Sequence, residues 1–146
     1  MGWRPRRDAA WARAATVTVV DTSAWVEYLR ATGSPADTAV AAAIRIGDEL
    51  VVLDVVRLEL LAGAGSDDRA DELRRFLARF TALPAASPAD HEVAADLYRA
   101  ARRAGHTVRS LLDCLVAAAA LRVDAPVLAR DRDFTVLAGV SALKLA

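Results

Sequence analysis

Short apolar stretches alternate with amphipathic stretches along most of this sequence, and this alternation limits the folds that the chain can adopt. Five apolar stretches predict β-strands: VTVV (17–20), ELVVLD (49–54), TALPA (81–85), APVLA (125–129) and SALKL (141–145). They are nearly continuous in apolar residues, as strands covered on both faces are. Because helical stretches separate them, we predict an α/β fold, a three-layer α/β/α sandwich with a central parallel sheet.

The stretches between the strands show helical periodicity and helix start and stop signals. The predicted helices are 22–31, 35–46, 55–64, 67–80, 88–105, 110–122 and 133–139. Thr22 or Ser23 opens the first helix, Pro35 starts the second, and Gly105 ends the long fifth one. In such folds ligands bind beyond the carboxyl ends of the strands, so functional residues are expected there.

The first fifteen residues differ in composition from the rest of the 146-residue chain. MGWRPRRDAAWARAA (1–15) has four arginines and no long apolar run, which does not fit a signal peptide. We interpret 1–15 as a basic, weakly ordered leader; an RNA-binding or partner-binding arm is the alternative. Residues 16–146 are expected to form a single folded domain.

Charge and cysteine content restrict the partners and the location. The formal net charge is zero, so no overall field attracts nucleic acid or membranes. No apolar run is long enough to span a bilayer, and no membrane partner is expected. The single cysteine, Cys114, excludes an internal disulfide and favours a cytoplasmic location.

One aspartate stands out in RSLLDCLVAAAAL (109–121), a predicted helix with almost no polar face. An unpaired carboxylate in a dry interior costs several kcal/mol, so Asp113 needs a partner, a helix end or an open site. Ser110 and Asp113 could form a capping box at the start of this helix. The alternative is that Asp113 belongs to a functional site.

Four further carboxylates lie where local packing explains them poorly. Asp21 directly follows the first strand, and Asp131 and Asp133 follow the strand at 125–129. Glu59 has only apolar or small residues three and four positions away on its predicted helix. Individually, each aspartate could cap a helix or lie in a solvated turn.

Taken together, these acidic motifs resemble those of the PIN-domain ribonucleases of the VapC toxin type. The matching stretches are VVDTSAWVEYL, RLELLAG, GHTVRSLLDCLVAAAAL and LARDRDF, in that order along the chain. The resemblance covers roughly Val17 to Leu145 and implies a PIN-like nuclease domain at 16–146.

The family pattern carries over onto individual positions. It implies catalytic acids at Asp21, Glu59, Asp113 and Asp131, which are also metal ligands together with Asp133; Asp131 is the better match to the final acid. It implies substrate-binding positions at Thr22, Ser23, Thr107, Arg109 and Arg130. Ala129 stands where many relatives have a threonine, so this chain lacks that hydroxyl.

Carboxylates that converge at one site repel one another, by about 4 kcal/mol for each pair at 4 Å and an effective dielectric constant near 20. A hard divalent cation with oxygen ligands relieves this repulsion. Because no histidine or thiolate accompanies these acids, Mg²⁺ or Mn²⁺ is favoured over zinc.

The resemblance implies a metal-dependent endoribonuclease that acts as the toxin of a toxin–antitoxin pair. Metal-activated water would attack an RNA phosphodiester and leave a 5′-phosphate and a 3′-hydroxyl. VEYLRATGS, AARRAG and VRSLLDC resemble a branch of these toxins that favours transfer RNA as the substrate. The implied partners are RNA, a VapB-type antitoxin and a second copy of the chain.

Two other functions stay open on the sequence alone. A non-catalytic PIN-like domain could bind RNA or a partner, although its intact acids argue against this interpretation. A nuclease directed at DNA is also compatible, because phosphodiester chemistry does not depend on the sugar. Arg99, Arg102 and Arg103 share one side of the predicted helix 88–105, and a solvated surface is the simplest interpretation of them.

Overall fold

The computed structural model describes residues 17–84 and 87–146, and the predicted leader at 1–15 lies outside these ranges. The strands are β1 (Val17–Val20), β2 (Glu49–Leu53), β3 (Thr81–Leu83) and β4 (Val127–Leu128). They form one four-stranded sheet in the order β3-β2-β1-β4, and every pairing is parallel. The first and last of these strands along the chain are therefore neighbours in the sheet.

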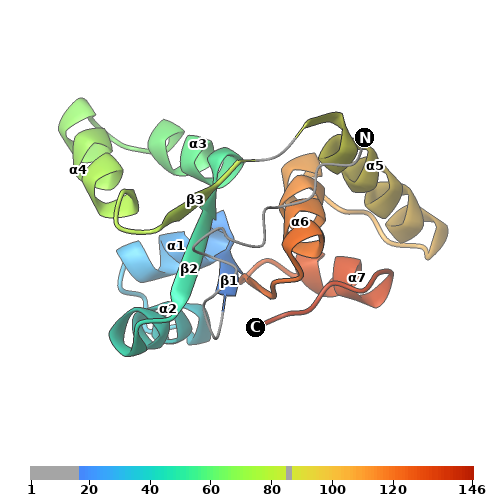
Figure 1. The fold of residues 1–146 in the computed structure, drawn as a ribbon, viewed down its shortest axis with the longest axis horizontal. Helices are drawn as coiled ribbons and strands as arrows, with labels where there is room; N and C mark the ends of the chain where they lie inside the picture. The colour runs from blue at the N-terminus through green and yellow to red at the C-terminus, as the bar shows by residue number, and fades with distance from the viewer. Residues whose placement is uncertain (1–16, 85–86) are drawn as a thin grey trace.

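Seven helices in the described residues cover the sheet on both faces: α1 (Thr22–Leu29), α2 (Pro35–Ile46), α3 (Asp54–Ala62), α4 (Asp67–Leu77), α5 (Ser87–Arg103), α6 (Leu111–Val123) and α7 (Asp133–Gly139). Figure 1 shows α1 to α4 on one side of the strands and α5, α6 and α7 on the other. The three-layer α/β/α sandwich with a parallel sheet is thus confirmed.

The prediction of a strand at 141–145 is wrong, because this segment forms no regular strand. Only Leu145 makes a β-bridge, to Val127, supported by a hydrogen bond from the Val127 N–H to the Lys144 carbonyl (2.9 Å). β4 has two residues and offers little edge for further pairing. Leu143 is nevertheless buried, so this segment contributes to the core without joining the sheet as a strand.

Local signals determine several of the helix ends. The Ser34 hydroxyl caps α2 by accepting from the Asp37 N–H, and Pro35 occupies the first turn, where it costs no hydrogen bond. α2 ends at Gly47, whose φ of 81° is a left-handed conformation that glycine adopts without strain. The α1 cap is Asp21 rather than Thr22 or Ser23, so this acid has a structural role as well.

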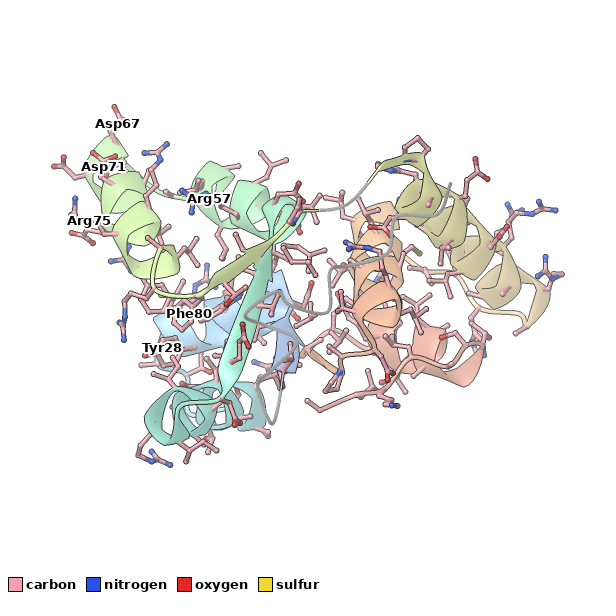
Figure 2. All side chains as sticks on the ribbon, viewed as in Figure 1. Tyr28, Arg57, Asp67, Asp71, Arg75 and Phe80 are labelled. Atoms are coloured by element: carbon pink, nitrogen blue, oxygen red, sulfur yellow. The ribbon has the colours of Figure 1, made fainter. Side chains whose placement is uncertain are left out.

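Four aromatic side chains pack α1 against α4 and the turn that follows α4. Trp25 is fully buried and contacts Phe76 and Phe80 with ring centroids 5.6 and 5.0 Å apart, while Tyr28 stacks on Phe76 at 5.9 Å. Figure 2 shows Tyr28 and Phe80 at this junction. These large apolar surfaces hold α4, an otherwise strongly charged helix, onto the domain.

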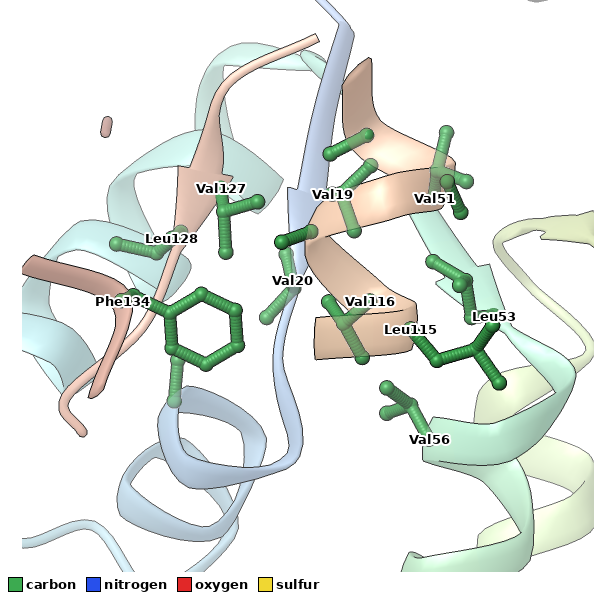
Figure 3. Close-up of a cluster of buried hydrophobic side chains, with 14 of the residues drawn as sticks. Val19, Val20, Val51, Leu53, Val56, Leu115, Val116, Val127, Leu128 and Phe134 are labelled. Carbon is green, nitrogen blue, oxygen red and sulfur yellow. The ribbon is translucent and has the colours of Figure 1, made fainter. Parts of the chain in front are cut away.

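α6 is buried on nearly all sides, which explains why its sequence has no polar face. Cys114 to Ala120 are all buried, with α5 on one side and the sheet on the other. Figure 3 shows Leu115 and Val116 of α6 among Val19, Val51 and Leu53 of the sheet. Its apolar run belongs to this core: no helix in the described ranges is both long enough and apolar enough to cross a membrane.

The alanines of α6 allow this close packing, and a larger side chain there should destabilise the fold. Ala117 is 0% exposed, so we expect Ala117→Leu to lower the free energy of unfolding by about 1–3 kcal/mol. Ala95→Leu, on the exposed face of α5, is the matched control and should change it little. Urea unfolding of both variants measures the difference, and equal stabilities would contradict the proposed packing.

Candidate active site

Acidic side chains gather where β1 and β4 end. Asp21 directly follows β1, Asp131 and Asp133 follow β4, and Asp113 lies in the first turn of α6. One carboxylate oxygen from each of Asp113, Asp131 and Asp133 lies within 4.8 Å of the others. Asp21, Asp113 and Asp133 are buried, at 2%, 8% and 2% exposure. Buried charges this close need a counter-charge or a proton.

Glu59 adjoins the cluster through Thr22 and does not belong to the group of three. The Thr22 hydroxyl donates a hydrogen bond to Glu59 Oε1 at 3.0 Å, which ties α3 to the start of α1. The half-buried Glu59 also contributes to raising the pKa of Asp21. All five predicted acids therefore lie in one region. The charge of Glu59 acts on Asp21, and the charge of Asp21 in turn raises the pKa of Asp113.

Burial and mutual repulsion favour the protonated forms of the central acids. Burial, followed by the charges of Asp21, Asp131 and Asp133, raises the pKa of Asp113 to about 8. Burial also raises the pKa of Asp21, although hydrogen bonds from Ser23 oppose this effect. Without an added positive charge, keeping all of these acids ionised at neutral pH is therefore unfavourable.

Two buried carboxylate oxygens, Asp21 Oδ1 and Asp113 Oδ2, accept no hydrogen bond from the described residues. Buried acceptors are normally satisfied, so their orientation calls for a ligand. The neighbouring donor atoms are carboxylate oxygens, which suit a hard divalent cation such as Mg²⁺ or Mn²⁺. The residues present therefore fit such a cation.

The capping-box interpretation of Asp113 is not supported. Ser110 is the N-cap residue of α6, but its side chain makes no capping hydrogen bond. The Asp113 carboxyl instead interacts with Asp133, so it is directed at the cluster. The first-turn position still suits its charge, because the helix N-terminus is the positive end of the helix dipole.

The Ser23 hydroxyl joins two distant parts of the chain inside the site. It donates to Asp21 Oδ2 at 2.6 Å and accepts from the backbone N–H groups of Arg130 at 2.9 Å and Asp131 at 3.3 Å. Asp131 in turn accepts from the Asp133 N–H at 2.9 Å. Ser23 thus fixes the loop after β4 against Asp21, whereas the sequence pattern placed it among the substrate-binding residues.

The two predicted phosphate-binding arginines are paired with acids of the protein. Arg109 Nη2 lies 3.3 Å from Asp131 Oδ1, and its backbone N–H donates to Asp133 at 2.9 Å. Arg130 forms an ion pair with Glu27. The pKa of Glu27 is lowered by a hydrogen bond from the Thr32 hydroxyl and, next, by one from Arg130. Both arginine side chains remain mostly exposed, at 64% and 58%.

A hollow of about 500 Å³ lies beside the acids, lined by Ser23, Val26, Glu27, Arg109, Arg130, Asp131 and Arg132. Sequence reasoning did not select Glu27 or Arg132. Glu27 could have been found, because it is the only acid within the helix at 22–29. The remaining predicted position, Thr107, is exposed in the connection between α5 and α6.

A parallel three-layer fold with acids at the strand ends is shared with a known family. The family model described as "PIN domain" matches residues 18–140, and the chain belongs to the PIN domain family. Within that family it is 43% identical over 131 residues to VapC ribonuclease Mb1587 of Mycobacterium bovis and to Ribonuclease VapC11 of Mycobacterium tuberculosis. Each match covers 88% of this chain and 96% of the relative.

Solved structures share the fold at low sequence identity. VapBC2 from Rickettsia felis, bound to a DNA fragment from its promoter, matches with a TM-score of 0.71 and 15% identity, covering 90% of this chain and 98% of that chain. VapBC-1 from nontypeable Haemophilus influenzae matches with a TM-score of 0.71 and 16% identity, covering 90% and 97%. The PIN-like fold expected from the sequence is thereby confirmed.

The raised pKa of Asp113 makes metal-free stability depend on pH. Between about pH 4 and pH 8 the folded protein keeps a proton that the unfolded chain releases, so stability falls as pH rises. Asp113→Asn should flatten this fall and, at about pH 7.5, melt at the same temperature as the parent or higher. Melting curves in EDTA across this range test it, with the exposed Glu92→Gln as control. A destabilised variant with an unchanged pH profile would contradict the cluster.

The hydrogen bonds of Ser23 should also be measurable. Ser23→Ala leaves the N–H groups of Arg130 and Asp131 without their acceptor, so we expect a loss of about 1–2 kcal/mol in unfolding free energy. Ser110→Ala removes a hydroxyl that makes no capping bond and should cost less. Denaturant titration compares the two, and a larger loss for Ser110→Ala would refute the role assigned to Ser23.

Proposed function

We propose that this protein is a Mg²⁺- or Mn²⁺-dependent endoribonuclease and the toxin of a toxin–antitoxin pair. The observation that carries the proposal is the convergence of Asp113, Asp131 and Asp133 within 4.8 Å. Relatives at 43% identity are named VapC ribonucleases, which supports RNA as the substrate. Transfer RNA is the favoured class because of the motifs described above.

We assign the cation to Asp113, Asp131 and Asp133, with Asp21 as a further ligand. The unsatisfied oxygens of Asp21 and Asp113 support this assignment. When bound, a divalent ion lowers the pKa of water, offsets phosphodiester charge and aligns the reacting groups. Ser23 contributes by holding Asp21 and the backbone of Asp131 in fixed relative positions.

Glu59 has a different task in this proposal. Thr22 holds its Oε1 at 3.0 Å, which leaves the second carboxylate oxygen to accept the proton of the attacking water. Attack at phosphorus breaks the bond to the 3′ oxygen, which takes a proton from solvent and leaves as a 3′-hydroxyl, and Glu59 releases the proton that it accepted to solvent. The products are then a 5′-phosphate and a 3′-hydroxyl.

Arg109 and Arg130 are proposed to bind the RNA backbone. Their exposed guanidinium groups border the hollow beside the acids and can exchange a protein carboxylate for a phosphate. Thr107, exposed near Arg109, is proposed to contact the same strand. These contacts position the substrate and carry no base specificity.

We further propose a VapB-type antitoxin and a second copy of this chain as protein partners. The support for the antitoxin is that the structural neighbours are VapBC assemblies. A basic side chain from the antitoxin would satisfy the same acids that the cation occupies. This predicts that the antitoxin competes with the metal for the site.

Cleavage should require both the cation and Asp113. Purified full-length protein with Mg²⁺ or Mn²⁺ should cut transfer RNA to 5′-phosphate ends, and excess EDTA should abolish cutting. Asp113→Asn should lower the rate by at least about 100-fold, a typical effect of removing a charged active-site group. Glu92→Gln, exposed on α5, is the control.

The other outcomes identify the alternatives. Unchanged cleavage in EDTA contradicts the metal mechanism. Tight RNA binding without cleavage, at any metal concentration, would make this a binding domain, and equal cutting of single-stranded DNA would remove the preference for RNA.

A further inference from the structure

Three arginines on α5 face one hollow away from the acid cluster. Arg99, Arg102 and Arg103 line a space of about 400 Å³, and all three are exposed. Their spacing of three and four residues places them on one helix face. Within 17–84 and 87–146, none of them forms an ion pair with a carboxylate. The hollow is therefore strongly positive.

The helix dipole explains only part of this arrangement. Arg102 and Arg103 lie in the last turn of α5, where cations are favourable, but Arg99 lies a turn earlier. Like charges at these spacings destabilise a helix. Arginines on α4 show the alternative, because Arg69 and Arg74 pair with Glu72 and Asp71 three residues away. On α5, Asp96 lies three residues before Arg99, but no ion pair joins the two. Arg102 and Arg103 have no carboxylate three or four residues away, and this grouping fits an anionic ligand.

The three arginines lie in the last part of α5, at the end of this helix that is nearer the acids. α5 and α6 run in opposite directions, since Arg122 at the end of α6 bonds Asp90 at the start of α5 at 3.1 Å. The end of α5 is therefore near the start of α6, where Asp113 lies. From Arg103 the chain needs six residues to reach Arg109, at most about 20 Å. A strand of several nucleotides can span this distance.

We infer that Arg99, Arg102 and Arg103 form a second phosphate-binding site that holds the RNA strand beyond the cleavage site. The inference rests on the proposed function and adds that the RNA substrate is long enough to reach from the acids to these arginines. Guanidinium groups bind phosphate oxygens in pairs of parallel hydrogen bonds. Arg102 makes a cation–π contact with Tyr98, whose ring centroid lies 5.9 Å from the guanidinium carbon. RNA fits better than an acidic protein, because the arginines lie at the end of α5 nearer the acids that are proposed to cleave RNA.

The test measures RNA binding separately from cleavage. In the Asp113→Asn background of the full-length protein, the three arginines are replaced by glutamine, and binding to unfractionated transfer RNA is measured by fluorescence anisotropy at several salt concentrations. The slope of log affinity against log salt should fall by about 0.7–0.9 for each phosphate that the protein no longer neutralises. At about 0.1 M salt we expect binding at least about tenfold weaker.

The matched control replaces the exposed Arg74, Arg75 and Arg79, at and just after the end of α4, and removes the same charge. α4 lies at the far side of the molecule from α5, and Arg75 marks it in Figure 2. We expect its salt slope to stay near that of the parent. Equal losses of affinity in both triple variants would mean that only overall charge matters and would overturn the inference. Melting temperatures establish that both variants fold.

Two further outcomes separate the inference from the proposed function. If the protein cleaves RNA but the α5 variant keeps its full salt slope, the second site is wrong and the ribonuclease stands. If that variant instead loses binding to a poly-glutamate peptide, the arginines serve an acidic protein partner. If the parent neither binds nor cleaves RNA, both proposals fail together.

Discussion

Repulsion among buried carboxylates is the constraint around which this domain is arranged. Asp21, Asp113 and Asp133 are almost fully buried, and the pKa of Asp113 is raised to about 8. Such a cluster survives only if the surrounding structure is rigid enough to keep the acids together. The fully buried α6, the capped start of α1 and the Ser23 hydroxyl supply this rigidity. Repulsion among the acids thus lowers the stability of the folded state, and packing of the core offsets this loss.

The parts of the structure that depend on local patterns could be predicted from the sequence. β1 and the helix bounded by Pro35 and Gly47 follow from apolar runs and helix signals over a few residues. The five acids could be selected because each lacked a packing explanation, and parallel strands bring their carboxyl ends to one edge. Asp113 was the strongest signal, because the cost of burying a carboxylate in an apolar helix is large.

The parts that depend on contacts between distant segments could not be predicted. Ser23 meets Arg130 across more than a hundred residues, and no local pattern shows which way a hydroxyl points. Arg109 and Arg130 were selected for their places beside the acids, yet their pairing with Asp131 and Glu27 depends on how two loops approach. The prediction of a strand at 141–145 was wrong for a similar reason. Whether this segment pairs as a strand depends on the length of its partner β4, which has two residues, and not on the segment's own sequence.

The neighbouring positions of β1 and β4 have a consequence for the chain during its synthesis. β1 leaves the ribosome first, but its partner β4 and the loop with Asp131 emerge only after more than a hundred further residues. A growing chain can therefore form α1 to α4 around β1 and β2 while the acid cluster does not yet exist. Translation that stops before residue 127 yields a protein without this site. The topology thus delays any cluster-dependent activity until β4 and the loop with Asp131 have been synthesised.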